Sequence, residues 1–173
     1  LTLGTHGYAQ RVLSAIDCAR VLTDRGIDCS LTIAGRLGWF GGVAETRRAI
    51  AKLGLDEKVT LVASFTQDEA AELYRAHHIL LHPKYLDPCP TVVIEALASG
   101  LPIVASGSGG LPELVPSSCG ELIPVPLSWE ELITPTGEQL AAAVEALLPR
   151  LGQVARAARL HAEASYDCTK WVE

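Results

Sequence analysis

Methionine is absent from this sequence of 173 residues, and aromatic residues make up only 5% of it. Long apolar runs are missing too, because Gly, Pro or charged residues interrupt every apolar stretch before the about 20 residues of a membrane-spanning helix. A basic excess is also lacking, since 20 acidic residues outnumber 14 Lys and Arg and give a net charge of −6. We therefore expect no transmembrane segment in this chain and no nucleic-acid partner.

Closely spaced cysteines are lacking as well. The five cysteines stand singly, without a C-x-x-C pair or a Cys/His cluster at metal-ligand spacing: Cys18, Cys29, Cys89, Cys119 and Cys168. Their odd number favours reduced, mostly buried thiols in a cytoplasmic setting over disulfides, and no secretory signal is visible. Because the sequence opens at Leu1 and contains no Met, we expect a piece of a longer protein, whose association with a membrane stays open.

Short apolar strands alternate with amphipathic helices, which is the pattern of a parallel sheet covered on both faces. Strands are predicted over residues 1–4, 29–35, 59–62, 79–81, 101–105 and 119–124. Helices are predicted over 8–24, 43–53, 66–76 and 90–99, from 112, from 136 and around 154–160, the last leading toward Trp171. Two capping boxes, Thr66-x-x-Glu69 and Thr136-x-x-Gln139, mark helix starts. The chain is predicted to form one α/β domain with about six strands.

The stretch from Asp87 to Ser106 carries the strongest functional signal. It places Glu95 within an apolar helical run, where an ionised carboxylate is costly unless it meets hydrogen-bond donors. The helix that begins at Pro90 offers the free N–H groups of Thr91 and Val92 to an anion, for which a diphosphate is the natural candidate. One turn further on, Glu95 can accept two hydrogen bonds from a ribose diol.

This stretch, followed by Gly109-Gly110-Leu-Pro-Glu113, resembles the C-terminal donor-binding domain of retaining GT-B glycosyltransferases of the group 1 type. The hallmark of that family is E-x7-E, continued as E-A-h-A-x-G-h-P-h-V-A-S, where h is apolar. The resemblance covers nearly the whole chain and implies a Rossmann-like, doubly wound parallel sheet. It also implies that residues 1–173 form a nucleotide-sugar-binding domain whose N-terminal acceptor domain is absent from the sequence.

The resemblance implies transfer of a sugar from a UDP-, GDP- or ADP-sugar donor, with no metal or other cofactor and no activity in the isolated piece. Asp87 matches the acid that contacts the donor sugar and supports its departing centre, and Glu95 matches the acid that holds the ribose. Thr91 and Val92 match the backbone donors to the diphosphate. Other candidates for substrate binding lie in loops that follow strands, where ligands of such sheets bind: Ser64 and Phe65 for the base, Gly35, and Gly109.

The sequence departs from the family pattern at two points. Asp87 is one methylene shorter than the usual Glu, and Thr5 and Gln10 stand where the family carries a diphosphate-binding Arg and Lys. Lys84, Arg11 and Arg36 are candidates to replace the lost charge. Lys84 is favoured because it shares a loop with Asp87, whereas Arg11 belongs to the start of a helix and is expected to point away.

Two other functions stay open. The first is a non-catalytic nucleotide-binding or assembly domain that has lost the phosphate-binding cations, and the second is one half of a sugar-nucleotide epimerase. Glu95 could bond backbone N–H groups, although its neighbours in the sequence leave it few side-chain partners, and Asp87 could be a turn residue. Gly107–Gly110 could be a simple turn. Four histidines are expected to be ordinary structural or solvated residues: His6, His77, His78 and His82.

Overall fold

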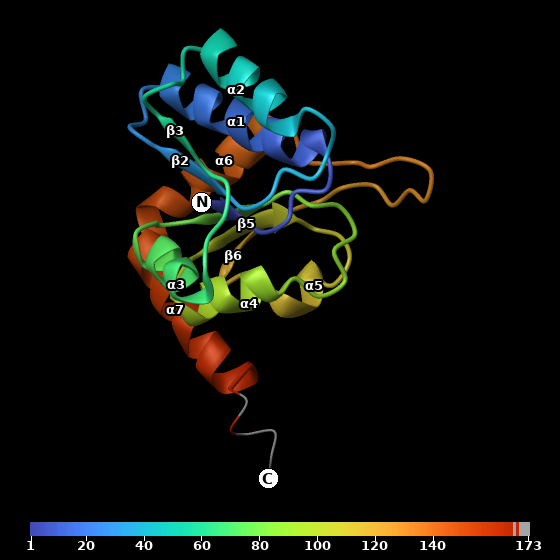
Figure 1. The fold of residues 1–173 in the computed structure, drawn as a ribbon. Coiled ribbons are helices and arrows are strands. Elements are labelled where there is room, and N and C mark those ends of the chain that lie inside the picture. The colour runs from blue at the N-terminus through green and yellow to red at the C-terminus, as the bar shows by residue number, and fades with distance from the viewer. Residues whose placement is uncertain (168, 170–173) are drawn as a thin grey trace.

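The computed structural model describes residues 1–167 and 169 (Figure 1). The described residues hold six strands, all paired in parallel: β1 (Thr2–Leu3), β2 (Leu31–Ala34), β3 (Val59–Val62), β4 (Leu80–His82), β5 (Ile103–Ser106) and β6 (Gly120–Ile123). The helices are α1 (Ala9–Asp24), α2 (Gly42–Lys52), α3 (Gln67–Arg75), α4 (Thr91–Ala98), α5 (Leu111–Leu114), α6 (Gly137–Leu147) and α7 (Leu151–Ser165), with a 3₁₀ turn η1 (Leu148–Arg150) before α7. The α/β fold class is therefore confirmed, while Cys168 and Trp171 lie outside the described residues.

The strands form two ladders of three, β1-β2-β3 and β4-β5-β6, rather than one continuous ladder. The ladders meet at β1 and β4, where the Leu81 N–H donates to the Leu1 carbonyl at 2.7 Å and the Leu1 amine donates to the Ile79 carbonyl at 3.0 Å. The short β1 limits the pairing there to these two bonds. Across the junction the order is β3-β2-β1-β4-β5-β6, the doubly wound order of Rossmann-like folds.

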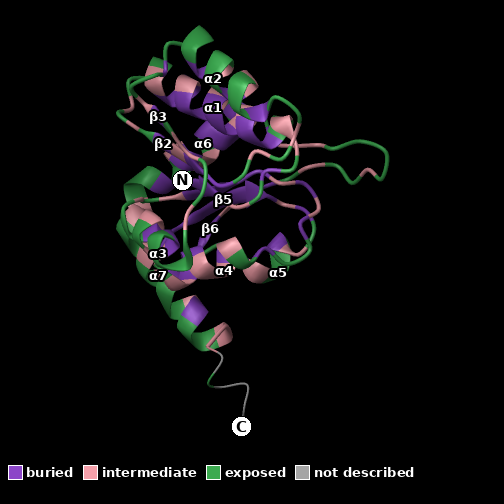
Figure 2. Cartoon of the chain, viewed as in Figure 1, coloured by how far each residue is buried: buried purple, intermediate pink, exposed green. Residues whose placement is uncertain are grey.

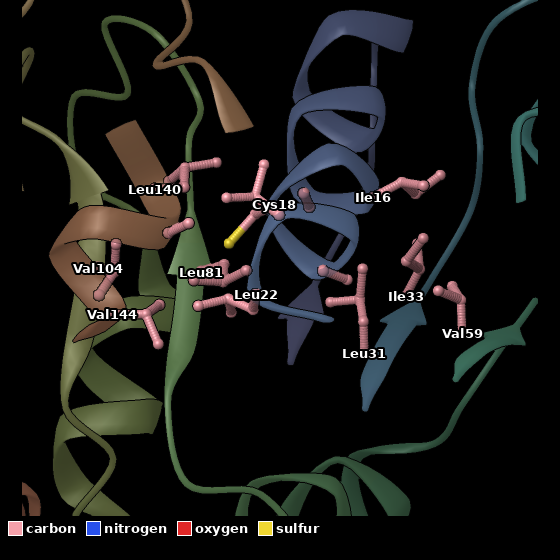
Figure 3. Packing of buried hydrophobic residues seen from close by; sticks show 14 of the residues in the cluster. Ile16, Cys18, Leu22, Leu31, Ile33, Val59, Leu81, Val104, Leu140 and Val144 are labelled. Atoms are coloured by element: carbon pink, nitrogen blue, oxygen red, sulfur yellow. The ribbon is translucent and has the colours of Figure 1, made fainter. Parts of the chain in front are cut away.

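Helices cover both faces of the strands, and each face has its own core (Figures 1 and 2). One core joins α1 and α6 to residues such as Leu81 and Val104, and Figure 3 shows Leu22, Leu140 and Val144 packed around these strands. The other core holds the buried faces of α3, α4 and α7 with the adjacent strand residues Leu80 and Ile103. Successive residues of a strand point to opposite faces. The apolar residues of β4 and β5 therefore serve both cores.

Local signals placed most elements within one or two residues of their bounds. Both capping boxes are present, at Thr66 with Glu69 and at Thr136 with Gln139. The observed strand β4 lies one residue later than the predicted strand 79–81, because the buried His82 continues the ladder opposite Ala105. The predicted strand 101–105 begins later, at Ile103.

No helix among residues 1–167 and 169 is long and apolar enough to cross a membrane. The four described cysteines are free, with Cys18 and Cys119 buried, Cys29 half-buried and Cys89 exposed. The expectation of mostly buried thiols was therefore only partly right.

Candidate functional site

The order of the strands reverses between β1 and β4, and the loops after these two strands meet at their carboxyl ends. Such a switch point is where open α/β sheets bind ligands. The main chain after β2 packs directly against the main chain after β1. A Cβ at Gly35 would lie 2.1 Å from the Gly4 carbonyl oxygen, and both glycines have positive φ. Only glycine permits this approach. Gly35 is therefore a buried part of the frame of the crevice.

Asp87 lies in the loop after β4 and is nearly buried. His82 Nε2 is 2.9 Å from Asp87 Oδ2, and Lys84 Nζ is 3.0 Å from the same oxygen. Burial favours the neutral acid, but the hydrogen bond from His82 and the ion pair with Lys84 outweigh it, so the pKa of Asp87 lies below its ordinary value. Asp87 is therefore held as a carboxylate, and Lys84 is directed to the candidate site.

Arg11 turns into the molecule from the first turns of α1, although it was expected to point away. Its guanidinium donates to the carbonyls of Thr5 at 3.1 Å and Leu3 at 3.2 Å, and Nη2 lies 3.5 Å from His82 Nδ1. Arg11 is thus a buried cation directly behind His82, and its Nε has no hydrogen-bond partner among the described residues. Arg36, the third candidate cation, is exposed in the loop after β2.

The loop that carries Asp87 is shaped by a glycine-rich neighbour. A Cβ at Gly109 would lie 2.3 Å from the Asp87 carbonyl oxygen, and the Gly110 N–H donates to that oxygen at 2.9 Å. Leu86, immediately before Asp87, has a φ of 48°, and its N–H donates to Ser108 Oγ at 3.0 Å. A leucine in the left-handed region is uncommon and persists where the surroundings enforce it. Gly107–Gly110 is therefore more than a simple turn.

The helix α4 begins at the end of this loop, with Pro90 at its N-cap. No side chain caps it, so its first N–H groups remain available. Thr91 is exposed and Val92 is half-buried at the start of the helix. The positive end of the helix dipole and these N–H groups together favour an anion at this position.

Glu95 is half-buried on α4 and has a side-chain partner that the sequence did not reveal. The Tyr74 hydroxyl donates to Glu95 Oε2 at 2.7 Å from α3. Burial and this carboxylate both raise the pKa of Tyr74, so the phenol stays protonated and remains a donor. Glu95 therefore has one side-chain partner, which comes from another helix and not from its neighbours in the sequence.

Ser64 and Phe65 lie after β3, where Ser64 is exposed and Phe65 is half-buried. With Glu69 and Leu73 they help to line a hollow of about 330 Å³. A larger cavity of about 630 Å³ lies at the opposite, amino ends of the strands, where Leu1, Leu31 and Ile79 contribute to its wall. None of the predicted site residues lines this larger cavity.

The structure thus gathers Asp87 and Lys84 in one loop, with Gly109 packed against its backbone and α4 following. It adds His82 and Tyr74, to which sequence reasoning assigned no part in the site, and it turns Arg11, a candidate cation that was expected to point away, toward His82. One sequence signal could have identified His82, since it precedes Asp87 by five residues directly after the predicted central strand. Among the described residues, no group of three or more His, Cys, Asp or Glu side chains is arranged to hold a metal ion.

Comparison with known proteins gives a consistent result. The family model described as glycosyl transferases group 1 matches residues 1–136. The D-inositol 3-phosphate glycosyltransferase of Mycobacteroides abscessus is 38% identical over 112 residues, which cover 64% of this chain and 23% of that protein. The match therefore covers less than a quarter of the length of this relative.

Solved structures share the fold. The C-terminal domain of a glycosyl transferase group 1 family protein (LpcC) from Francisella tularensis superposes with a TM-score of 0.76 at 16% identity, covering 96% of this chain and 85% of that one. Anabaena Alr3699/HepE in complex with UDP superposes with a TM-score of 0.74 at 20% identity, covering 98% of this chain and 45% of that one.

Proposed function

The chain belongs to the glycosyl transferases group 1 family, and we propose that it is the donor-binding domain of a retaining GT-B glycosyltransferase. A second, N-terminal domain of the longer protein would supply the acceptor site. One observation carries the proposal: His82 and Lys84 hold Asp87 as a carboxylate at the strand switch point, one short loop before the uncapped start of α4. An acid, a cation and free N–H groups then meet where a sugar diphosphate would lie.

The diphosphate would bind at the start of α4. The N–H groups of Thr91 and Val92 would donate to its oxygens, and Lys84 would supply a positive charge close by. Preorganised donors of this kind stabilise the charge that grows on a leaving diphosphate as the sugar departs. Lys84 would thereby replace part of the charge that is missing at Thr5 and Gln10.

Asp87 would contact the donor sugar and support its departing centre. An ionised carboxylate accepts hydrogen bonds from sugar hydroxyls and stabilises positive charge as it develops. The lowered pKa of Asp87 fits this role, because the group stays charged over the neutral range.

The nucleoside would lie further along the carboxyl ends of the strands. Glu95 would accept hydrogen bonds from the ribose diol while Tyr74 occupies its Oε2 atom. Ser64 and Phe65 would meet the base, and Gly35 and Gly109 would let the main chain of neighbouring loops pack closely around the crevice that holds the ligand. The donor would be a UDP-, GDP- or ADP-sugar; the neighbour HepE was solved with UDP.

The acceptor domain would cover the loops at this end of the sheet. Phe40 in the loop after β2, and Leu127 and Trp129 in the loop after β6, expose large apolar side chains there. The second of these loops extends well beyond its neighbours (Figure 1). Exposed apolar groups of this size are typical of surfaces that meet another domain or a ligand. The protein would act in the cytoplasm, alone or at a membrane, and the isolated chain would bind donor without transferring sugar.

The second candidate is a non-catalytic domain that keeps the fold and has lost phosphate affinity. The uncharged Thr5 and Gln10 favour it. A thermal-shift screen of the chain against UDP, GDP, ADP and their sugars separates the two functions, because ligand at about 100 times its dissociation constant stabilises a protein by roughly 2.7 kcal/mol. Stabilisation by one nucleotide and its sugar supports the donor-binding function. No stabilisation by any of them at millimolar concentration supports the non-catalytic domain.

A further inference from the structure

His82 stands between a buried cation and the proposed catalytic acid. Its Nδ1 atom lies 3.5 Å from Arg11 Nη2, and its Nε2 atom lies 2.9 Å from Asp87 Oδ2. The imidazole is almost fully buried at the carboxyl end of β4. A ring fixed at both nitrogens in this way has one orientation available to it.

Arg11 determines which nitrogen of His82 carries the proton. A guanidinium has donors and no acceptor, so the His82 Nδ1 atom that faces it must present its lone pair. The proton of the neutral ring then lies on Nε2 and is donated to Asp87. Burial, helped by the nearby charge of Arg11, lowers the pKa of His82 although the bond to Asp87 opposes this, so the ring is neutral at pH 7.

The charged and titratable neighbours of this ring come from three segments. Arg11 projects from α1, His6 lies in the loop after β1, and Lys84 and Asp87 belong to the loop after β4. Arg11 is itself bonded to the main chain at Leu3 and Thr5. A connected series therefore runs from the backbone after β1 through Arg11 and His82 to Asp87.

This series leaves one carboxylate oxygen of Asp87 open. Asp87 Oδ2 accepts the hydrogen bond from His82 and forms the ion pair with Lys84. Asp87 Oδ1 has no hydrogen-bond partner among residues 1–167 and 169. The Asp87 side chain keeps 10% of its surface exposed, so it is not sealed from a ligand. A side chain already held in place loses less conformational entropy when it binds.

We propose that His82 is a positioning residue: fixed by Arg11 as the Nε2–H tautomer, it holds Asp87 so that Oδ1 faces the donor sugar. This inference rests on the proposed function, because it assigns the ligand of Asp87. His82 touches neither the sugar nor the diphosphate in this arrangement.

Calorimetry first measures the affinity of the unmodified chain for three pairs of compounds: UDP-glucose and UDP, GDP-mannose and GDP, and ADP-glucose and ADP. The pair that binds most tightly is then used with the variants. His82→Phe removes the donor to Asp87, and the affinity ratio of sugar nucleotide to diphosphate should fall about tenfold, the value of a hydrogen bond to a charged group. His82→Gln places an amide N–H near the former Nε2 position and should restore most of the ratio. His78→Gln, an exposed histidine at the other end of β4, is the matched control and should leave the ratio unchanged.

The pH profile separates positioning from a merely structural role. Without the His82 donor the pKa of Asp87 should rise. When the solution is acidified, the His82→Phe chain should therefore lose its extra affinity for the sugar nucleotide at a higher pH than the unmodified chain does. ¹⁵N NMR of the unmodified chain should show His82 as the Nε2–H tautomer near neutral pH. That measurement needs no variant to fold.

Each outcome is decisive. A His82 ring in the Nδ1–H tautomer, an unchanged ratio in His82→Phe, or equal affinity of the unmodified chain for diphosphate and sugar nucleotide overturns the positioning role and leaves nucleotide binding intact. Absence of binding to all six compounds overturns the proposed function itself, and the positioning role with it.

Discussion

The hydroxyl of Tyr74 on α3 donates a 2.7 Å hydrogen bond to Oε2 of Glu95 on α4. The two residues are 21 positions apart, and their pairing gives an otherwise isolated carboxylate one fixed oxygen. The remaining oxygen has no hydrogen-bond partner within the part of the chain that the structure describes. Glu95 is therefore oriented from one side before any ligand arrives.

Glu95→Gln should weaken nucleotide binding by about tenfold or more, because a charged acceptor of the ribose diol becomes neutral while its shape is kept. Tyr74→Phe should weaken binding less, since it frees Glu95 without removing its charge. Calorimetry with the best-bound nucleotide measures both. Unchanged affinity in a folded Glu95→Gln chain would refute the ribose assignment.

Lys84→Ala should lower affinity for a nucleoside diphosphate by about tenfold and leave affinity for the nucleoside nearly unchanged. The loss should shrink in high salt, since the Debye length falls from about 10 Å at 0.1 M to about 3 Å at 1 M. Lys58→Ala is the matched control, because Lys58 pairs with Asp28 at 3.2 Å at the opposite end of the strands. Equal losses for nucleoside and diphosphate would show that Lys84 does not serve the phosphates.

Gly109→Ala should both destabilise the chain and weaken donor binding, because the new Cβ would meet the Asp87 carbonyl at 2.3 Å. Gly54→Ala separates the two costs. Gly54 has a φ of 65°, close to the 63° of Gly109, and a Cβ there meets nothing within 4 Å. We expect a loss of about 1 kcal/mol at Gly54 from the left-handed backbone alone, and a further loss of about 1–3 kcal/mol at Gly109 from overpacking.

Urea titrations of the two glycine variants measure these free energies of unfolding. Equal free energies of unfolding in both variants would mean that the loop around Asp87 moves to accommodate the new Cβ without loss of stability. Gly109 would then not fix the position of that loop.

Stability should fall as the pH is lowered from about 6.5 toward 4. Burial, with the nearby Arg11, lowers the pKa of His6 to about 4, so the unfolded chain takes up a proton in this interval that the folded chain does not. Each such histidine contributes a slope of about 1.4 kcal/mol per pH unit. His82, whose pKa is also lowered by burial, acts in the same direction.

His6→Gln isolates the contribution of His6, because the amide keeps a donor for the Ala34 carbonyl, which His6 Nε2 contacts at 3.1 Å. Urea unfolding of both chains from pH 4 to 7.5 should show a shallower slope in the variant. Parallel curves would mean that His6 takes up its proton without cost in the folded chain.

Much of the fold could be predicted from the sequence because the signals are local. The capping boxes at Thr66 and Thr136 have the predicted partners, and the apolar stretches gave all six strands. The bounds went wrong where side-chain polarity and backbone pairing disagree. His82 is polar and still extends β4, because its backbone position continues the ladder to Ala105.

The candidate site was less accessible to sequence reasoning. A pattern along the chain identified Asp87, Glu95 and Lys84, but it could not say what holds them. Tyr74 lies on a different helix from Glu95, and Arg11 reaches His82 across 71 positions of the sequence. Such contacts depend on how whole elements pack, and periodicity along one element carries no information about them.

The sequence by itself determined that this chain forms alternating strands and helices and that acids and free helix N–H groups follow the central strand. Only the tertiary structure decided that Arg11 points inward and that His82 joins it to Asp87. The physical reason is the junction of β1 with β4, where two backbone hydrogen bonds bring together loops that begin about 80 residues apart. A buried cation is stable there because the carbonyls of Leu3 and Thr5 accept its hydrogen bonds and the charge of Asp87, from the other loop, favours it.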